Sequence, residues 1–479
     1  MKTYSEKRKA VALILYTVIS TISLLLSVIM PMINHYIHGL IILCCAVISY
    51  FVSVLCVSDR NWMDIRALFS GVWLGTIGLA ALRLVDYQKP WHVKTWILLA
   101  LAFVAFQIGA TLGIAWGPKL YGNIEKRFKK IKFKRIDFQL HENRLFLICV
   151  ITTLIGLTCF IINVLIRGYI PCFSDNPNAY VDFYTKFHIF STAATAVSGL
   201  CFYCIRTQPL KLWKKVILTL CIFYLVIAFP ILVVSRGVLM VAALSLIISI
   251  FYTCGKRFLA LVLSIIVIMG VYLFASTLRN YTDQQLSTIF QPSEITTPNK
   301  PTDPNNPANP GDNPFGSTSV IFQLSPKMAF LYGYVTVSHD NLNEAVENIQ
   351  GYTWGVRQLV PINVILQSDW IAQQNVDAEY YTVTPNLLTT NLIGDFYYDF
   401  GMVGVAFFMV LWSLVFGIVQ AVADKNKGPF SLLALGNVMT PVALCFFDSW
   451  MSIFNFWMFW GVALLLAIAT YFTIKKKQK

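Results

Sequence analysis

Four arginines stand at places where a permanent positive charge has a chemical use. They are Arg167, Arg236, Arg279 and Arg357. Arg236 lies in a short link between two apolar stretches, and Arg279 closes another such stretch. A guanidinium binds a phosphate through two parallel hydrogen bonds and stays charged at any physiological pH. The arginines therefore predict a site for a diphosphate-bearing substrate; the alternative is that they reach out to lipid phosphates.

Two carboxylates open the apolar stretch that starts near residue 395. Asp395 and Asp399 are four residues apart, so they lie on one face of a helix, and Tyr397 and Tyr398 stand between them. Carboxylates and tyrosines in this arrangement orient a sugar or take a proton from its hydroxyl group. The alternative is an interfacial belt of aromatic rings, with carboxylates that pair with the arginines. His339 is a further candidate base, although a lone histidine in a loop is more often solvated.

The motifs of metal, nucleotide and disulfide chemistry are missing from the sequence. It has no GxxxxGK(S/T) phosphate-binding loop and no HExxH zinc motif. Of its 11 cysteines, all but Cys172 fall within or at the ends of apolar stretches. Neither a disulfide framework nor a zinc site is predicted from that pattern. We therefore expect no metal ion and no cofactor.

Long apolar stretches must position these groups. A helix needs roughly 20 apolar residues to cross a bilayer, and about twelve windows of the chain qualify. The windows are 10–30, 38–57, 64–82, 95–116, 145–166, 187–205, 212–233, 238–253, 258–276, 395–422, 430–447 and 451–473. A mean hydropathy of +0.64, with 57% hydrophobic and 13% charged residues, excludes the ordinary soluble classes. The sequence therefore predicts an all-α polytopic membrane protein with about 12 transmembrane helices.

The loops between these windows predict the orientation. Lysine and arginine are retained on the cytoplasmic side of a membrane, and the first residues include Lys2, Lys7, Arg8 and Lys9. With the N-terminus inside, every second loop is basic, and so is the C-terminal tail. Both termini are therefore predicted to be cytoplasmic. The net charge of +14 follows from this topology without a nucleic-acid partner, and the basic run at 126–135 is expected to lie against anionic lipids.

Three parts follow from this topology. Residues 1–277 form an N-terminal bundle of about nine spans, 278–392 a large extracytoplasmic loop, and 393–479 a C-terminal bundle of about three spans. A loop of this length in a compact membrane protein is generally functional. Its Pro/Asn-rich insertion at 292–314 lacks the apolar residues of a core, so we expect a tether at the surface.

Two stretches after the insertion have a more regular pattern. Residues 325–349 have an apolar period that predicts an amphipathic helix. Residues 351–365 are apolar and aromatic enough to lie on the membrane surface or against the outer ends of the spans. Both stretches belong to the large loop, so they are expected to form its ordered part.

Four short motifs carry a resemblance to a known family. They are Arg167-Gly168-Tyr169-Ile170-Pro171, Ser235-Arg236-Gly237, the loop element from Gly351-Tyr352-Thr353 to Leu359-Val360-Pro361, and the run Ile393-Gly394-Asp395-Phe396-Tyr397-Tyr398-Asp399-Phe400-Gly401. The last motif is the most specific. With these motifs the chain resembles the bacterial oligosaccharide repeat-unit polymerases, the Wzy-type O-antigen and capsular polysaccharide polymerases. The Pro/Asn-rich insertion departs from the compact loop of that family.

The resemblance implies a metal-independent glycosyltransferase of GT-C-like helical architecture in the bacterial cytoplasmic membrane. Such an enzyme joins repeat units carried on undecaprenyl pyrophosphate into O-antigen, capsular or exopolysaccharide at the outer face. The expected partners are the lipid-linked oligosaccharide, membrane lipids, a chain-length regulator and a flippase. The family's hairpin arginine matches Arg236, its loop element holds Arg357, and its tyrosine/glycine signature holds Asp395 and Asp399.

A sequence-based hypothesis gives each residue a role. One of the two carboxylates or His339 deprotonates the acceptor hydroxyl, which attacks the anomeric carbon of the donor. Arg236 and Arg279 hold the departing pyrophosphate, and Arg357 closes over it from the loop. The residues expected to bind the substrate are Arg167, Tyr352, Tyr397 and Tyr398.

Two other classes of protein remain open at this point. A ligase that moves finished glycan from the same lipid to another acceptor needs nearly the same parts. A flippase or another transporter would also use many spans, but transporters place polar groups midway through broken helices and show repeated halves. Here the polar groups gather at the outer ends of spans and the two halves of the chain show no convincing repeat, which favours the polymerase.

Overall fold

The structure is a computed structural model that describes residues 2–85, 87–130, 142–174, 183, 185–254, 262, 266, 270, 326–371, 380–384 and 389–475. Every regular element of these residues is a helix, which confirms the predicted helical class. Eight helices of the described chain are long and apolar enough to cross a membrane. They cover Glu6–Ile29, His35–Val57, Val93–Asn123, Arg144–Arg167, Lys186–Thr207, Leu212–Leu232, Arg236–Thr253 and Gly394–Asn426.

Three shorter apolar helices cover Ile65–Ala81, Pro429–Ala443 and Phe454–Ala467. Together with the eight longer ones they fall on every predicted window except 258–276, of which only residues 262, 266 and 270 are described. The predicted helix positions are therefore confirmed for the described windows. The count of about 12 spans and the GT-C-like architecture stay predictions.

The helices in chain order are α1 (Lys2–Ile29), α2 (His35–Val52), α3 (Ile65–Ala81), α4 (Val93–Lys130), α5 (Glu142–Arg167), α7 (Lys186–Ala194), α8 (Ser198–Thr207), α9 (Leu212–Phe223), α10 (Phe229–Leu232), α11 (Arg236–Thr253), α14 (Pro326–Asn348), α15 (Val356–Leu366), α17 (Gly394–Asn426), α18 (Pro429–Ala443) and α19 (Phe454–Lys475). Short π or 3₁₀ turns are η1 (Ser53–Val57), η2 (Pro171–Phe173), η3 (Thr195–Val197), η4 (Tyr224–Ala228) and η5 (Trp450–Ser452).

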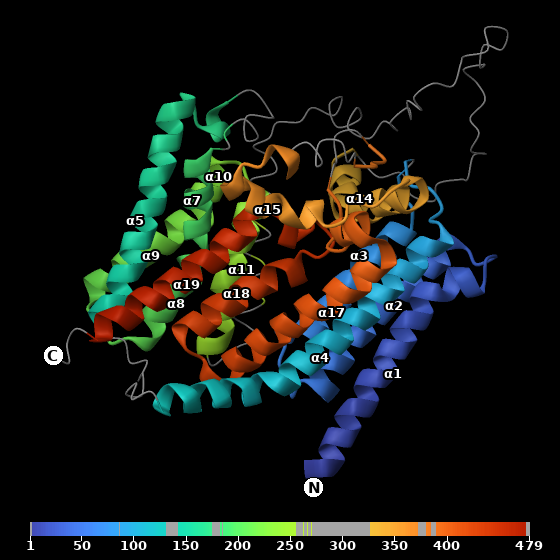
Figure 1. Cartoon of the computed structure of the whole chain (residues 1–479), viewed down its shortest axis with the longest axis horizontal. Helices are drawn as coiled ribbons and strands as arrows, with labels where there is room; N and C mark the ends of the chain where they lie inside the picture. Colours follow the sequence, from blue (N-terminus) through green and yellow to red (C-terminus); the bar gives the residue numbers. More distant parts are fainter. Residues whose placement is uncertain are drawn as a thin grey trace.

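The helices form one bundle, and two further helices cover one end of it (Figure 1). Helices α1 to α4 pack against one another, and α4 packs with α17. Helices α5, α7, α8, α9 and α19 lie on the other side, with α11 and α18 between the two groups. Helices α14 and α15, which fall in the segment predicted to be a large loop, lie across the end of the bundle opposite the N-terminus. The candidate site residues of α15 and α17 meet at that end.

Helix α17 is held along its length by a close seam with α4. A Cβ atom added to Gly113 would lie 2.1 Å from the carbonyl oxygen of Leu414, and one added to Gly417 would lie 2.4 Å from that of Ala110. Such small residues let two helix backbones approach closely, so that packing and weak polar contacts fix the pair. The seam holds the part of α17 that follows its first turns close against α4.

The first turns of α17 are separated from the rest by a break at Gly401. This glycine has φ 62° and ψ −148°, a conformation that is almost confined to glycine. A Cβ atom at Gly404 would lie 2.6 Å from the carbonyl oxygen of Phe396 in the same helix, so this second glycine also permits the sharp bend.

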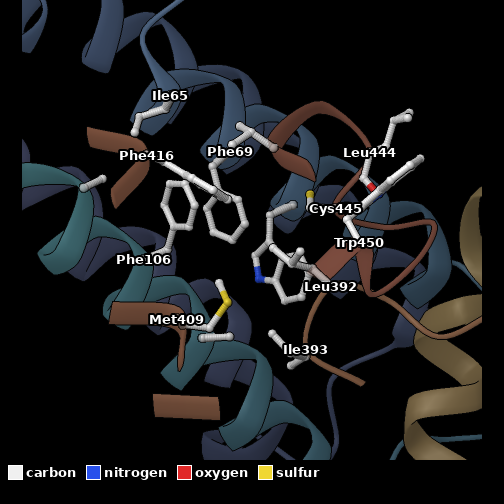
Figure 2. Close-up of a cluster of buried hydrophobic side chains, with 14 of the residues drawn as sticks. Ile65, Phe69, Phe106, Leu392, Ile393, Met409, Phe416, Leu444, Cys445 and Trp450 are labelled. Carbon is white, nitrogen blue, oxygen red and sulfur yellow. The ribbon is translucent and has the colours of Figure 1, made fainter. Parts of the chain in front are cut away.

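A buried apolar cluster fixes the start of α17 in space (Figure 2). The rings of Phe69 and Phe106 stack with their centroids 3.8 Å apart, and Leu392 and Ile393 belong to the same core cluster. The backbone N–H of Leu392 donates to the carbonyl oxygen of Cys445 at 2.8 Å. The link between α18 and η5 is therefore tied to the residues that lead into α17.

Helix α14 confirms the helix predicted after the insertion, but its polar residues point inward. Residues 336–346 are buried against α3 and α4. The carboxylate of Asp340 accepts hydrogen bonds from Gln88 Nε2 at 2.9 Å and Trp91 Nε1 at 2.8 Å. Burial, opposed by these two donors, raises the pKa of Asp340 to about 7. The buried polar groups have partners here, as the interior of a protein requires.

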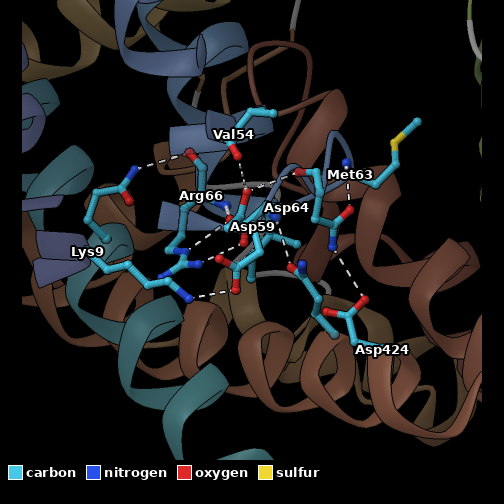
Figure 3. A network of polar contacts seen from close by, with 12 residues as sticks. Lys9, Val54, Asp59, Met63, Asp64, Arg66 and Asp424 are labelled. Atoms are coloured by element: carbon cyan, nitrogen blue, oxygen red, sulfur yellow. Dashed lines mark hydrogen bonds and ion pairs between the residues drawn. The ribbon is translucent and has the colours of Figure 1, made fainter. Parts of the chain in front are cut away.

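A second polar cluster lies at the other end of α17 (Figure 3). The Arg66 side chain donates to Asp64 through Nε at 3.0 Å and through a terminal nitrogen at 2.8 Å. Asp424 of α17 accepts from the Tyr252 hydroxyl at 2.5 Å. Nearby, Lys9 Nζ lies 2.6 Å from Asp59 Oδ2. We name this set the lower cluster.

Candidate functional site

The N-terminus of helix α15 is capped by a carboxylate of α17. The residue before the helix, Gly355, has φ 95°, a conformation that favours glycine. The carboxylate of Asp399 then accepts the backbone N–H groups of Arg357 and Gln358, each at 3.1 Å. A negative charge at a helix N-terminus satisfies free N–H groups and complements the helix dipole. Asp399 therefore fixes the position of α15 and of its first side chains.

The segment before α15 is clamped onto the same turns of α17. The backbone N–H of Thr353 donates to the carbonyl oxygen of Tyr398 at 2.9 Å, and that of Trp354 to the carbonyl oxygen of Asp399 at 3.1 Å. The half-exposed side chain of Tyr352 lies over Gly401, where a Cβ atom would be 2.6 Å from its hydroxyl oxygen. The break in α17 therefore makes room for the loop that carries α15.

The Arg357 side chain points into the protein and rests on aromatic rings. It is only 1% exposed, and its guanidinium carbon lies 3.6 Å from the ring centroid of Tyr380 and 4.7 Å from that of Tyr398. A cation over the face of a tyrosine is stabilised by the negative face of the ring. The hydroxyl oxygen of Tyr398 accepts the backbone N–H of Tyr381 at 2.9 Å, which holds the described segment 380–384 in place.

Arg357 opens onto a cavity of about 320 Å³. The residues that line it are Arg357, Val360, Tyr380, Thr389, Asp395, Asp448, Ser452 and Ile453. Asp395 is 4% exposed, and its Oδ1 accepts the Tyr380 hydroxyl at 3.2 Å. Convergent charged groups on a concave site are the usual mark of ligand binding. One cation and two carboxylates thus share a single cavity.

Asp448 is the second carboxylate on that cavity. It lies in the link between α18 and η5, and its Oδ1 accepts the backbone N–H of Ser449 at 2.8 Å. Burial and, second, the charge of Asp395 raise the pKa of Asp448 to about 7, against the opposing effect of the Ser449 N–H. A carboxyl group with such a pKa exchanges its proton near neutral pH, which suits acid–base chemistry.

The structure brings several of the predicted residues together. Arg357 and Asp395 line the cavity. The carboxylate of Asp399 accepts the backbone N–H of Arg357, and the guanidinium of Arg357 lies over the ring of Tyr398. Tyr397 is buried beside Tyr352, with their ring centroids 6.3 Å apart. Arg357 and the turn that carries the tyrosines and aspartates therefore lie next to one another, and their roles stay predictions.

Of the other predicted arginines, Arg236 and Arg167 are among the described residues, and neither lines this cavity. Arg236, at the first turn of α11, is 2% exposed, and its guanidinium carbon lies 5.2 Å and 5.0 Å from the rings of Phe330 and Tyr334. Both rings belong to α14, so Arg236 ties α11 to that helix. Arg167 is exposed at the end of α5, and Arg279 lies outside the described residues.

His339 lies in the interior of the bundle end. Its Nδ1 accepts the Asn391 side-chain amide at 3.0 Å, and its Nε2 lies 3.0 Å from the Thr76 hydroxyl. Burial lowers the pKa of His339 to about 3, so the ring is neutral at physiological pH. The ring is not among the residues that line the cavity. Its role as a base gains no support from this geometry, which instead gives His339 a part in joining α3, α14 and the start of α17.

Two residues that line the cavity, Asp448 and Tyr380, are not among those predicted from the sequence. Asp448 stands in the short link between the windows 430–447 and 451–473, which the predicted topology places outside. The criterion that selected the arginines, an ionisable group at the outer end of a span, applies to it equally. Tyr380 has no comparable signal, because its place depends on contacts with residues far along the chain.

Of three comparisons with known proteins, one found a match. Residues 327–442 match the model of a family described as "Putative O-antigen polymerase". The matched range runs from α14 to α18 and so includes Arg357, Asp395 and Asp399. No curated protein and no solved structure matches the chain. The match confirms the resemblance found in the sequence and supports a polymerase role in polysaccharide synthesis.

Proposed function

We propose that the chain is a glycosyltransferase that polymerises lipid-pyrophosphate-linked oligosaccharide repeat units into O-antigen, capsular or exopolysaccharide. One observation carries the proposal: Arg357, a buried arginine, faces Asp395 and Asp448 across one cavity, and it lies within the segment that matches the polymerase family. A polymerase that uses a diphosphate leaving group needs a fixed cation beside a group that accepts a proton.

We place the reaction on the outer face of the bacterial cytoplasmic membrane, with both termini in the cytoplasm and about 12 spans. Two observations support this placement. The basic N-terminal residues begin α1 at the end of the bundle opposite α14 and α15. The cavity lies at the end that carries α15, where a lipid-linked sugar would present its diphosphate near the membrane surface.

In the proposed reaction, the donor is the growing chain on undecaprenyl pyrophosphate and the acceptor is a single repeat unit on a second lipid. Arg357 binds the diphosphate through its planar fork of N–H groups and stabilises the negative charge that develops as the bond breaks. The tyrosine rings behind it hold the guanidinium in position before substrate arrives. Asp399 is a positioning residue, because it holds the backbone of Arg357.

Some predicted roles change with this assignment. Arg236 rests on two rings of α14, so it does not enter the proposal as the group that binds the leaving diphosphate. Arg279 keeps its predicted role as a prediction, as do Arg167, Tyr352 and Tyr397 as substrate contacts. Because single repeat units must reach the outer face and polymer length must be limited, a flippase and a chain-length regulator are proposed partners.

Arg357→Ala tests the proposal. In a strain that lacks the native gene, the wild-type chain should restore polymer, whereas the variant should lower polymer formation at least about 100-fold and let single-unit glycolipid accumulate. Arg357→Lys should also fail, since an ammonium lacks the planar fork. The matched control is Arg206→Ala, at an exposed arginine near the end of α8, which should form normal polymer.

Three results would contradict the proposal or replace it. Normal polymer with Arg357→Ala would remove Arg357 from the mechanism. Finished polymer retained on the carrier lipid would indicate the ligase instead. Single units that stay on the cytoplasmic side of the membrane would indicate a transporter.

A further inference from the structure

Two structural ties bring Asp395 and Asp448 to the same cavity from different parts of the chain. The backbone N–H of Leu392, three residues before Asp395, donates to the carbonyl oxygen of Cys445 at 2.8 Å. The hydroxyl of Ser449, next to Asp448, donates to the carbonyl oxygen of Leu392 at 3.3 Å. These bonds fix the two backbones side by side, so the pair of carboxylates is a built feature of the fold.

The two carboxylates differ in what surrounds them. Asp395 is buried and accepts the Tyr380 hydroxyl at 3.2 Å. Asp448 is partly exposed at the cavity and accepts a backbone N–H. The charged and titratable groups that line the cavity with them are Arg357 of α15 and Tyr380. Asp448 is therefore the carboxylate more open to a ligand, while Asp395 is held by its neighbours.

We propose that Asp448 is the catalytic base that takes the proton from the acceptor hydroxyl, and that Asp395 tunes it through the charge it places beside it. This inference rests on the proposed function. The acceptor oxygen forms a bond to the donor's anomeric carbon as the bond from that carbon to the diphosphate oxygen breaks. The bonding electrons leave with the diphosphate, which Arg357 binds. The hydroxyl proton goes to a carboxylate oxygen of Asp448 and from there to water.

The pKa of Asp448 fits that task. A base acts only when deprotonated, so the rate should hold above its pKa and fall as the pH drops through it. Because burial and the charge of Asp395 raise this pKa to about 7, the fall should occur near neutral pH. Replacing Asp395 by asparagine removes the neighbouring negative charge, so the same fall should move to lower pH.

The experiment measures the polymerisation rate against pH for the full chain in lipid nanodiscs, with a lipid-pyrophosphate-linked repeat unit as substrate. Asp448→Asn should lose roughly 100-fold or more at every pH, as the loss of a general base does, and Asp448→Glu should recover part of the rate. Asp395→Asn should keep a measurable rate, and the fall of its rate on the acid side of the pH–rate profile should move to lower pH. The matched control is Asp340→Asn, since the pKa of Asp340 is also raised to about 7, but away from the cavity; its acid limb should not move.

The outcomes separate this inference from the proposed function. A wild-type rate for Asp448→Asn, alongside an inactive Arg357→Ala, would overturn the inference and leave the polymerase standing. An acid limb that Asp395→Asn does not move would also overturn it, because the titrating group would then be another residue. An inactive Asp448→Asn variant supports the catalytic role of Asp448 if it keeps the wild-type melting temperature and still binds the lipid-linked unit. Loss of both properties would overturn the catalytic role and indicate a structural one.

Discussion

The two ends of α17 carry the same kinds of residue in two different arrangements. In the lower cluster, both carboxylate oxygens of Asp64 accept hydrogen bonds from the Arg66 guanidinium. At the other end, the Arg357 guanidinium lies over two tyrosine rings and opens onto a cavity that also holds two carboxylates. The first arrangement pairs its charges with each other at the start of α3, and the second places its charges around a cavity.

This difference shows that residue type alone does not mark a site. A buried guanidinium in a bidentate ion pair with a carboxylate uses much of its hydrogen-bonding capacity within the protein. Such an ion pair is part of the folded structure. The Arg357 guanidinium rests on ring faces and lines a cavity that a diphosphate can enter. The relation of the arginine to a cavity is what separates the two roles.

Loss of the lower ion pair should give the largest change in stability. Arg66→Ala leaves Asp64 buried without its cation, so the free energy of unfolding should fall by about 3–5 kcal/mol. Thermal unfolding in nanodiscs measures the change, and the polymerisation rate per folded molecule should stay at the wild-type value. The double variant Asp64→Asn with Arg66→Met, which keeps an acceptor at the helix start, should recover most of the stability. A loss of rate without a loss of stability would make the lower cluster a functional site and break the comparison.

Removal of the carboxylate behind Arg357 should have an intermediate effect. Asp399→Ala removes the cap of α15, which is worth about 1–2 kcal/mol, and lets Arg357 shift. The rate should therefore fall roughly tenfold, since about 1.4 kcal/mol in the barrier corresponds to that factor. Kinetics of the purified chain measure it, with Asp399→Asn as the conservative variant that keeps one acceptor oxygen and part of the rate. An unchanged rate in Asp399→Ala would show that Arg357 does not depend on this cap.

The smallest effect should come from a single hydrogen bond in the lower cluster. Tyr252→Phe removes the hydroxyl that donates to Asp424. The net loss should be about 1 kcal/mol, seen as a drop of a few degrees at most in melting temperature. Polymer yield and chain length should not change. A shorter or absent polymer in this variant would show that the two ends of α17 are coupled.

The helices could be predicted from the sequence because their signal is local. A window of apolar residues long enough to cross a bilayer identifies α1 or α17 without knowledge of its neighbours. Arg357 and Asp395 could also be singled out from the sequence as candidate site residues, since charged groups at the ends of spans are rarely placed there without a use. What each does could not be read from spacing, because it depends on contacts across long stretches of chain.

Two residues illustrate that limit in physical terms. Asp399 sits four residues from Asp395, yet it caps a helix that begins 43 positions earlier in the chain, at Val356. His339 looks like a loop histidine in the sequence, yet folding buries it between Thr76 and Asn391. Tertiary packing determines the positions of both residues, and the local hydrophobic periodicity of the sequence carries no signal of it.

Electron cryomicroscopy of the chain in nanodiscs, with a phosphonate analogue of the lipid-pyrophosphate-linked repeat unit, tests the central claim most directly. The account predicts density for the diphosphate group against the Arg357 guanidinium and for the sugar between Asp395 and Asp448, with the lower cluster unchanged. Density for the diphosphate at another site, with this cavity vacant, would contradict it.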